Sequence, residues 1–198
     1  MTFFTGKGDG GTSKFFGDQE RTTKSSPRFW ALGGIDELNS LLGFCRGLAN
    51  QYRLREIAEI ILDVQQKLFI VQAEIAGGDR LTIRPLQPAA TEALEKKINQ
   101  LETSIGPITK FSVPGGHPFS GLLDYTRAVC RRVERNIMNY HEEKLEIEMD
   151  MISDETIARG INPAILSYIN RLSSLLFALA RWVNKNYKVS EKNPTYEQ

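Results

Sequence analysis

The stretch LREIAEIILDVQQKLFIVQAEIAGG, residues 54–78, decides the fold class. Its apolar residues recur every three or four positions: Leu54, Ile57, Ile61, Val64, Leu68, Val71 and Ile75. This spacing lines one face of an α-helix, and the closing Gly77-Gly78 pair is a usual helix stop signal. We therefore predict a bundle helix whose apolar face packs against other helices.

Four other segments have the same periodicity. They run from Ile35 to Leu48 after a Gly33-Gly34 break, from Leu94 to Ile105, from about Phe119 to Tyr140, and from Asn162 to Val183. In the last segment Asn162 is the expected N-cap and Pro163 the first helical residue, because asparagine and proline favour these positions. The predicted fold class is all-α, a five-helix bundle.

The stretch LEIEMDM, residues 145–151, alternates apolar with acidic residues, as a half-buried strand does. It lies in a long acidic connection, residues 142–155, so we interpret it as an exposed loop or a short local excursion rather than a paired strand. The polar C-terminal residues 188–198 are expected to form a flexible tail. The bundle would span residues 34–187, within a single domain of residues 1–198.

Composition limits the class of protein. The chain has 198 residues, of which 41% are hydrophobic, which fits one globular domain with a full core. A net charge of +1 gives no reason to expect nucleic acid as a partner. No apolar run approaches the length of about 20 residues that spans a membrane, and no leader precedes the chain, so a cytoplasmic protein is expected. Cys45 and Cys130 are expected to be buried thiols, and His117 and His141 do not predict a metal site.

Four arginines crowd one short stretch, YTRAVCRRVER at residues 125–135. At about 100° per residue, Arg127, Arg131 and Arg135 fall within one arc of the predicted helix. Glu134 lies in the same arc, and Arg132 lies at its flank. The alternative is a solvated face in which Glu134 pairs with an arginine. Arginine without lysine favours a polyanion such as a nucleoside triphosphate, because the guanidinium group binds phosphate in a bidentate manner.

The chain opens on a segment rich in Gly, Thr and Ser, TGKGDGGTS at residues 5–13. Its GKGDGG has the spacing of a dinucleotide-binding loop, but that loop needs a preceding strand and a parallel sheet, which the sequence does not supply. Glycine-rich backbone can still approach phosphate closely, and Thr5, Thr12 and Ser13 add hydroxyl donors. On composition alone, a flexible tail is the alternative.

Two further polar features are open to interpretation. Asn170, Ser174 and Arg181 form a stripe on the last helix with Phe177 among them, which indicates a ligand or subunit surface rather than plain solvent. Asp36 begins the first helix, where the helix dipole stabilises an acidic side chain. Pairing of Asp36 with an arginine of the fourth helix is the functional alternative.

Together these segments resemble the PduO-type ATP:cob(I)alamin adenosyltransferases. The motifs follow in order along most of the chain: TGKGDGGTS (5–13), KSSPR (24–28), GGIDELNSLLG (33–43), FSVPGG (111–116), RAVCRRVER (127–135) and YINRLSSLLFALAR (168–181). The resemblance implies a five-helix bundle that assembles as a homotrimer. ATP would be bound between adjacent subunits, with residues 1–30 as an ATP-binding segment.

The resemblance also implies roles for individual residues. ATP would be bound by Thr5, Gly6, Lys7, Gly8, Ser13, Lys24, Arg131, Arg132, Glu134, Arg135 and Asn170. The catalytic residues would be Arg131, Asp36, Arg127 and Phe111. Asp36 and Arg127 would form a salt bridge across the subunit interface. Phe111 would lie beneath the corrin ring of cobalamin, and Phe177 would add to this apolar floor.

The implied reaction is attack by the Co(I) of reduced cobalamin on the 5′ carbon of ATP, which releases inorganic triphosphate. The corrin metal is the nucleophile, so the protein supplies position and charge, together with Mg²⁺. Phe111 would displace the lower axial ligand and favour a four-coordinate Co(II) species that is easier to reduce. A flavoprotein reductase and an adenosylcobalamin-dependent enzyme are the implied partners.

Two residues depart from the family pattern. Asp124 stands where histidine is common, and Ser174 stands where aspartate is expected. They keep open a non-catalytic ATP- or adenosylcobalamin-binding protein that delivers or senses the cofactor. A plain helical oligomer whose arginines bind subunits is the third alternative.

Overall fold

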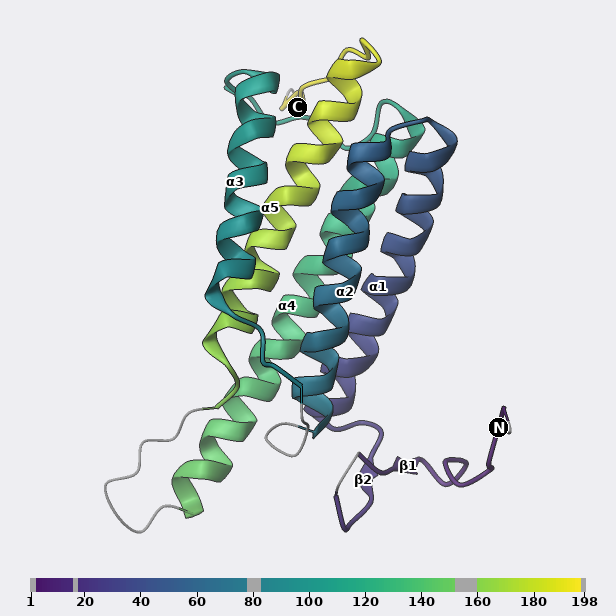
Figure 1. Cartoon of the computed structure of the whole chain (residues 1–198), viewed down its shortest axis with the longest axis vertical. Coiled ribbons are helices and arrows are strands. Elements are labelled where there is room, and N and C mark those ends of the chain that lie inside the picture. Colours follow the sequence, from purple (N-terminus) through teal and green to yellow (C-terminus); the bar gives the residue numbers. More distant parts are fainter. Residues whose placement is uncertain (1–2, 16–17, 78–82, 152–159, 197–198) are drawn as a thin grey trace.

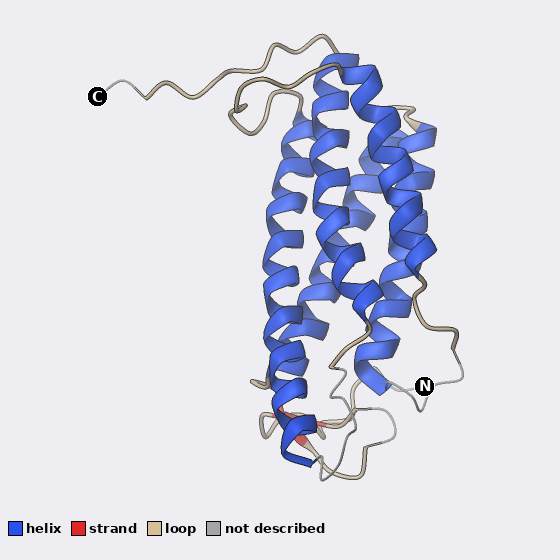
Figure 2. Cartoon of the chain, turned by 90° about the vertical axis from the view of Figure 1, so that its left-hand side faces the viewer, coloured by secondary structure: helices blue, strands red, loops and turns tan. Residues whose placement is uncertain are grey.

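The computed structural model describes residues 3–15, 18–77, 83–151 and 160–196. Within these ranges five long helices run along a common axis (Figure 1): α1 (Pro27–Gln51), α2 (Arg55–Gly77), α3 (Pro88–Ile105), α4 (Pro118–Met151) and α5 (Pro163–Asn186). A short antiparallel hairpin, β1 (Thr12–Ser13) with β2 (Thr22–Thr23), lies at one end of the bundle (Figure 2). The predicted five-helix bundle is confirmed.

Helices α2, α3 and α5 follow their sequence patterns. The apolar face of α2 is buried, including Ile61 and Leu68. Helix α3 ends at Ile105, and Gly106 follows it with a φ of 84°, a left-handed conformation that favours glycine. Helix α5 has the predicted cap, because the Asn162 side chain accepts a hydrogen bond from the Ala164 amide at 3.0 Å.

Helix α1 begins at Pro27, so the predicted break at Gly33-Gly34 is wrong. The Ser26 side chain caps this earlier start and accepts a hydrogen bond from the Phe29 amide. The helix continues through both glycines because α4 crosses it there. A Cβ on Gly34 would lie 3.3 Å from the Val133 side chain. This glycine therefore permits close helix packing rather than a turn.

Helix α4 continues through residues 145–151, so the loop predicted for that stretch is wrong. Lys144 pairs with Glu148 one turn later at 3.5 Å, as oppositely charged residues at this helical spacing do. The returning chain also packs on this end of α4, where the Gly160 amide donates to Glu148 at 2.9 Å. The remainder of the predicted acidic connection, residues 152–155, lies outside the described residues.

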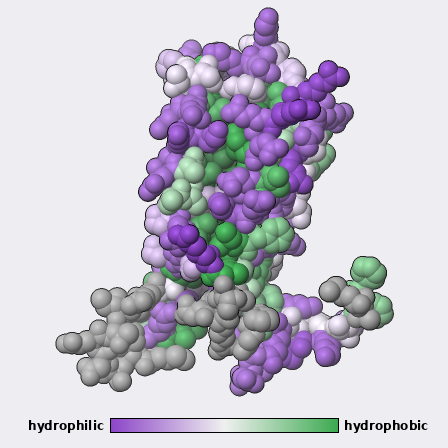
Figure 3. All heavy atoms as spheres, viewed as in Figure 1, coloured by the Kyte–Doolittle hydropathy of each residue, from purple (hydrophilic) through white to green (hydrophobic). Residues whose placement is uncertain are grey.

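The helices contact one another in the order α2, α1, α4, α5, α3, so that α4 lies in the middle, between α1 and α5. By length and composition α5 could cross a membrane, but most of its apolar window is buried inside the bundle, as in any core helix. On the face shown in Figure 3, hydrophilic side chains cover most of the bundle and hydrophobic ones show between them. The apolar character of α5 is thus accounted for by core packing.

The two adjacent glycines of α1 allow a matched test of this packing. We expect Gly33→Ala to raise the free energy of unfolding by about 0.5–1 kcal/mol, because a Cβ there meets nothing within 4 Å and alanine favours the helix. Gly34→Leu should lower it by about 1–3 kcal/mol, because the side chain must displace Val133 and Asn136. Urea unfolding at one protein concentration measures both, and equal effects would contradict the close α1–α4 contact.

Candidate active site

A groove of about 860 Å³ lies between the end of α3 with its following loop and the facing sides of α4 and α5. This volume is within the range of about 300–1,000 Å³ that small-molecule sites occupy. The groove brings together four predicted site residues from three segments: Phe111 on the loop, Arg127 and Arg131 on α4, and Phe177 on α5. Ser174 also lines it. An apolar surface and a cationic surface therefore meet in one concave site.

The two phenylalanines are held differently. The Phe111 side chain is 80% exposed on the loop after α3. Phe177 is partly buried, and two guanidinium groups lie over its ring, that of Arg127 at 5.5 Å and that of Arg181 at 5.1 Å from the ring centroid. These are cation–π distances, so the ring helps to place Arg127 at the wall of the groove.

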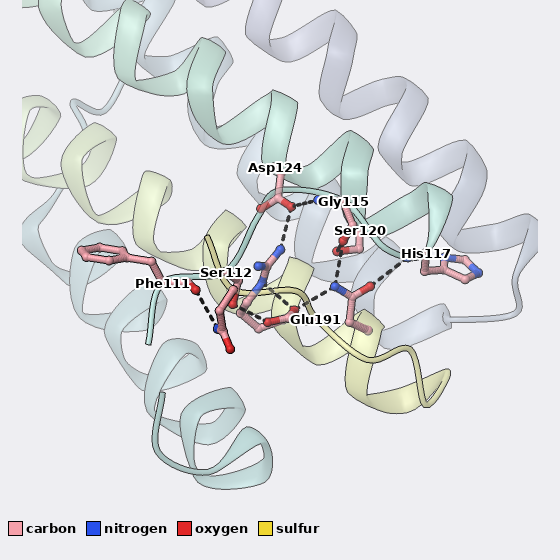
Figure 4. A network of polar contacts seen from close by, with 10 residues as sticks. Phe111, Ser112, Gly115, His117, Ser120, Asp124 and Glu191 are labelled. Carbon is pink, nitrogen blue, oxygen red and sulfur yellow. Dashed lines mark hydrogen bonds and ion pairs between the residues drawn. The ribbon is translucent and has the colours of Figure 1, made fainter. Parts of the chain in front are cut away.

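Arg181 does not face a ligand or the solvent as predicted, because it is only 2% exposed. Its Nη2 donates to Asp124 Oδ2 at 2.6 Å, and its Nε lies 3.1 Å from Glu191 Oε1, an ion pair without hydrogen-bond alignment (Figure 4). Asp124 therefore has a structural task in this chain. The sequence contains one indication of this burial that we missed, which is a single arginine within an apolar stretch of α5. Such an arginine is buried with its neighbours and must then have a charged partner.

The arginine face of α4 is open to solvent and is tied to its neighbours at two points. Arg132 donates to both carboxylate oxygens of Glu37 on α1 at 2.5 Å, and this contact raises the pKa of the guanidinium group. Glu134 accepts a hydrogen bond from Asn170 on α5 at 2.7 Å. The alternative in which Glu134 pairs with a neighbouring arginine is therefore not observed. Glu134 and Asn170, both predicted to bind ATP, contact each other instead.

Arg131 and Arg135 are exposed, and no hydrogen bond or ion pair holds either side chain within the described part of the chain. Asp36 is exposed as well, and within the same residues it pairs with no arginine of α4. The predicted contact between Asp36 and Arg127 is thus not made inside one chain. It stays a prediction for a contact between subunits.

The N-terminal segment forms a compact loop held by two cationic side chains. Arg21 donates to the Lys7 carbonyl at 2.5 Å and to the Thr12 carbonyl at 2.6 Å. The Lys24 ammonium group donates to the Gly8 carbonyl at 2.8 Å. Arg21 was missed from the sequence, because the fold of the hairpin decides which carbonyl groups lie within its reach.

This loop lies at the end of the bundle where α1 begins, whereas the loop between α3 and α4 lies at the other end (Figure 1). The predicted ATP-binding residues lie in two groups, one on the N-terminal segment and one on α4 and α5. The first group comprises Thr5, Gly6, Lys7, Gly8, Ser13 and Lys24, and the second comprises Arg131, Arg132, Glu134, Arg135 and Asn170. No described hydrogen bond joins the two groups.

Both thiols point into the core, as expected. Burial raises the pKa of Cys130 from its ordinary value of 9.0 to about 12, with Glu134 adding to the effect and Arg131 opposing it. Burial likewise raises the pKa of Cys45 to about 11, against a hydrogen bond with Thr126. Neither thiol can act as a nucleophile near neutral pH, because the reactive form is the thiolate.

The sequence profile of the family described as Cobalamin adenosyltransferase matches residues 3–183. The chain belongs to the cobalamin adenosyltransferase family. The corrinoid adenosyltransferase PduO of Salmonella typhimurium is 32% identical to this family member over 91% of the chain, and the match covers 49% of that protein. The corrinoid adenosyltransferase of Bacillus subtilis is 31% identical, over 93% of this chain and 87% of its own length. The chain thus spans about half the length of the Salmonella relative.

Solved structures agree with the family assignment. A phenylalanine-to-histidine variant of the PduO-type ATP:corrinoid adenosyltransferase from Lactobacillus reuteri, complexed with cobalamin and ATP, has a TM-score of 0.80 and 28% identity, over 100% of this chain and 98% of that one. An arginine-to-lysine variant from the same organism, complexed with ATP, has a TM-score of 0.77 and 28% identity, with coverage of 98% and 100%. This member of the cobalamin adenosyltransferase family therefore has the fold that its motifs predicted.

The buried thiols give a test of core integrity. We expect neither Cys45 nor Cys130 to react with a chromogenic disulfide reagent at about pH 8 in the native protein, and both to react in guanidinium chloride. The native state keeps its thiols protonated while the unfolded chain loses these protons above about pH 8.5, so the free energy of unfolding should fall as pH rises further. Rapid native reaction of either thiol would contradict the burial described above.

Proposed function

We propose that this protein is a corrinoid adenosyltransferase that moves the 5′-deoxyadenosyl group of ATP onto the Co(I) of reduced cobalamin. One observation carries the proposal: Phe111 and Phe177 share a groove with Arg127 and Arg131, in a member of the cobalamin adenosyltransferase family. The phenylalanine-to-histidine variant from Lactobacillus reuteri, which has the same fold, is complexed with cobalamin and ATP. An apolar macrocycle and a polyanion are the two partners that such a groove suits.

The residues of the groove fit this reaction step by step. Co(I) supplies the electron pair that forms the Co–C bond, and the bond from C5′ to the phosphate oxygen breaks as inorganic triphosphate leaves. The protein needs no nucleophile of its own, and its buried thiols offer none. Arg131 stands at the wall of the groove to stabilise the charge that collects on the departing triphosphate. Phe111 and Phe177 exclude water beneath the corrin ring.

The proposed assembly is a homotrimer with ATP bound between subunits. Within one chain the two groups of predicted ATP-binding residues do not meet, so a neighbouring chain would complete each site. The surface shared by α1 and α4 supports such an assembly, because Trp30 is 62% exposed, Phe44 59% and Tyr125 57%. Asp36 and Arg127 do not pair with each other within one chain. In the proposed trimer they would pair across the boundary between two subunits.

Mg²⁺ would accompany ATP in this proposal. Among the described residues no group of three or more His, Cys, Asp or Glu side chains lies together as a metal site. Mg²⁺ is commonly held by substrate phosphates, water and one or two carboxylates. Glu134 is the one carboxylate among the residues assigned to ATP, and it already accepts a hydrogen bond from Asn170. It is the side chain that fits Mg²⁺ at the triphosphate.

Other parts of the proposal follow from the chemistry. Co(II) must be reduced to Co(I) before it can attack carbon, so a flavoprotein reductase would supply the electron. An adenosylcobalamin-dependent enzyme would take the product, and a cytoplasmic location suits both partners. The rival function is a non-catalytic protein that delivers or senses ATP or adenosylcobalamin. Ser174 favours it, because this groove residue stands where the family pattern has an aspartate.

The function is tested by mixing the protein with ATP, Mg²⁺ and chemically reduced cobalamin. We expect a light-sensitive Co–C bond in the absorption spectrum and inorganic triphosphate as the released product. Arg131→Ala should lower kcat by about 10²–10³-fold, the loss that follows removal of one donor that stabilises charge in the transition state. The control is Arg55→Ala, an exposed arginine of α2 away from the groove, which should keep its turnover.

Three outcomes would count against these statements. Tight ATP binding without release of triphosphate would favour the delivery or sensor protein. Orthophosphate or pyrophosphate as the only product would rule out adenosyl transfer. Turnover of the Arg131→Ala variant near that of the Arg55→Ala control would remove Arg131 from the proposed catalytic role.

The subunit boundary is tested by charge reversal. Each chain has a mass of 22.3 kDa, so light scattering separates a trimer from a monomer clearly. We expect Asp36→Arg to disrupt the trimer, because it would face Arg127 of the neighbour, and Asp36→Arg combined with Arg127→Asp to restore it. Glu59→Arg, on the exposed side of α2, is the control. A wild-type protein that is monomeric at all concentrations would overturn the proposed assembly.

A further inference from the structure

The loop that carries Phe111, residues 106–117, has no helix or strand, and the C-terminal segment holds its backbone (Figure 4). The Val113 amide donates to the Lys192 carbonyl at 2.7 Å, and the Asn193 side chain donates to the Phe111 carbonyl at 2.8 Å. The Ser112 hydroxyl donates to Glu191 at 2.6 Å. The tail that was expected to be flexible is therefore bound along the Phe111 loop.

A second set of contacts holds the end of this loop. Asn184 donates to the Gly115 carbonyl and accepts from the His117 amide, both at 2.9 Å. The Gly115 amide donates to Asp124 at 2.9 Å. Gly116 has a φ of 102°, and a Cβ there would lie 2.7 Å from the Asn184 side-chain oxygen. Only glycine fits at this position, so the backbone is held close against α5.

Arg181 connects the two sets of contacts. Asp124, which binds the Gly115 amide, and Glu191, which binds Ser112, both lie against its guanidinium group. The side chains of Arg181 and Asp124 are 2% and 9% exposed, so their charges are removed from water and depend on one another. The same guanidinium group faces the Phe177 ring. Arg181 thus contacts Phe177 directly. It is connected to the loop that carries Phe111 through the carboxylates of Asp124 and Glu191.

We propose that the charge cluster of Asp124, Arg181 and Glu191 is a positioning device for Phe111, and that the C-terminal segment is a working part of the corrinoid site. The proposal rests on the proposed function. The Phe111 ring is 80% exposed and has little packing of its own. Its height above the groove is therefore set by the backbone beneath it. A binding group must be held within about 0.5 Å of its productive place, and the cluster supplies that constraint.

The first experiment measures amide hydrogen exchange in the ligand-free protein. Glu191→Ala removes the contacts to Arg181, Ser112 and Asn184 together, and the amides of Val113 and Gly115 should exchange about tenfold faster. Glu191→Gln keeps the shape of the side chain but not its charge, and should give an intermediate rate. Glu59→Ala, the same change on the exposed side of α2, should leave these amides unaltered.

The second experiment separates positioning from general damage. In Glu191→Ala the KM for cobalamin should rise and the four-coordinate Co(II) signal in the electron paramagnetic resonance spectrum should shrink, while the KM for ATP stays unchanged. Loss of the fold would alter all three together. Asp124→Asn provides a second variant, because it keeps the acceptor for the Gly115 amide but removes the charge that faces Arg181.

Two results would overturn the inference. One is unchanged exchange of Val113 and Gly115 in both Glu191→Ala and Asp124→Asn. The other is faster exchange with an unchanged Co(II) spectrum and an unchanged KM for cobalamin, which would leave the cluster as a stabilising contact only. Failure of the proposed function is distinguished from both, because a wild-type protein that binds cobalamin without adenosyl transfer still reports loop exchange and the Co(II) spectrum.

Discussion

Burial of one face of α4 positions the whole site. Leu123, Val129, Val133 and Ile137 are at most 1% exposed and pack between α1 and α5. The arginines on the other side cannot enter this core without a partner, because a buried charge is costly to desolvate. They must therefore face the groove or the surface. The neighbouring helices then supply Glu37 and Asn170, which contact Arg132 and Glu134.

The groove combines an apolar surface with positive charge. A macrocycle needs an apolar surface, and a triphosphate needs fixed positive charge. Phe177 reconciles the two, because its ring offers an apolar face to the groove while two guanidinium groups lie over it. In the proposed reaction the nucleophile is the metal of the substrate, so the protein need not supply one. What the chain contributes is position, charge and the exclusion of water.

Local patterns in the sequence predicted the helices, and contacts between distant segments explain the errors. The period of residues 54–78 is visible within one helix, and so is the cap at Asn162. The Gly33-Gly34 pair looked like a break because its true role depends on α4 crossing at Val133. Residues 145–151 looked like a loop because the contact that supports this end of the helix comes from Gly160.

Some residues of the site could likewise be predicted from the sequence, and others could not. Four residues of the groove could be named from the family motifs, since each motif is continuous along the chain: Phe111, Arg127, Arg131 and Phe177. The ion-pair partners of Arg181 could not, because Asp124 and Glu191 lie on other elements and a carboxylate can equally pair with water. The partner of Asp36 is harder still to predict. Its proposed partner belongs to another copy of the chain, so neither the sequence nor one chain contains the contact. In the proposed trimer each triphosphate would join two subunits, and ATP binding would then stabilise the assembly as well as the fold.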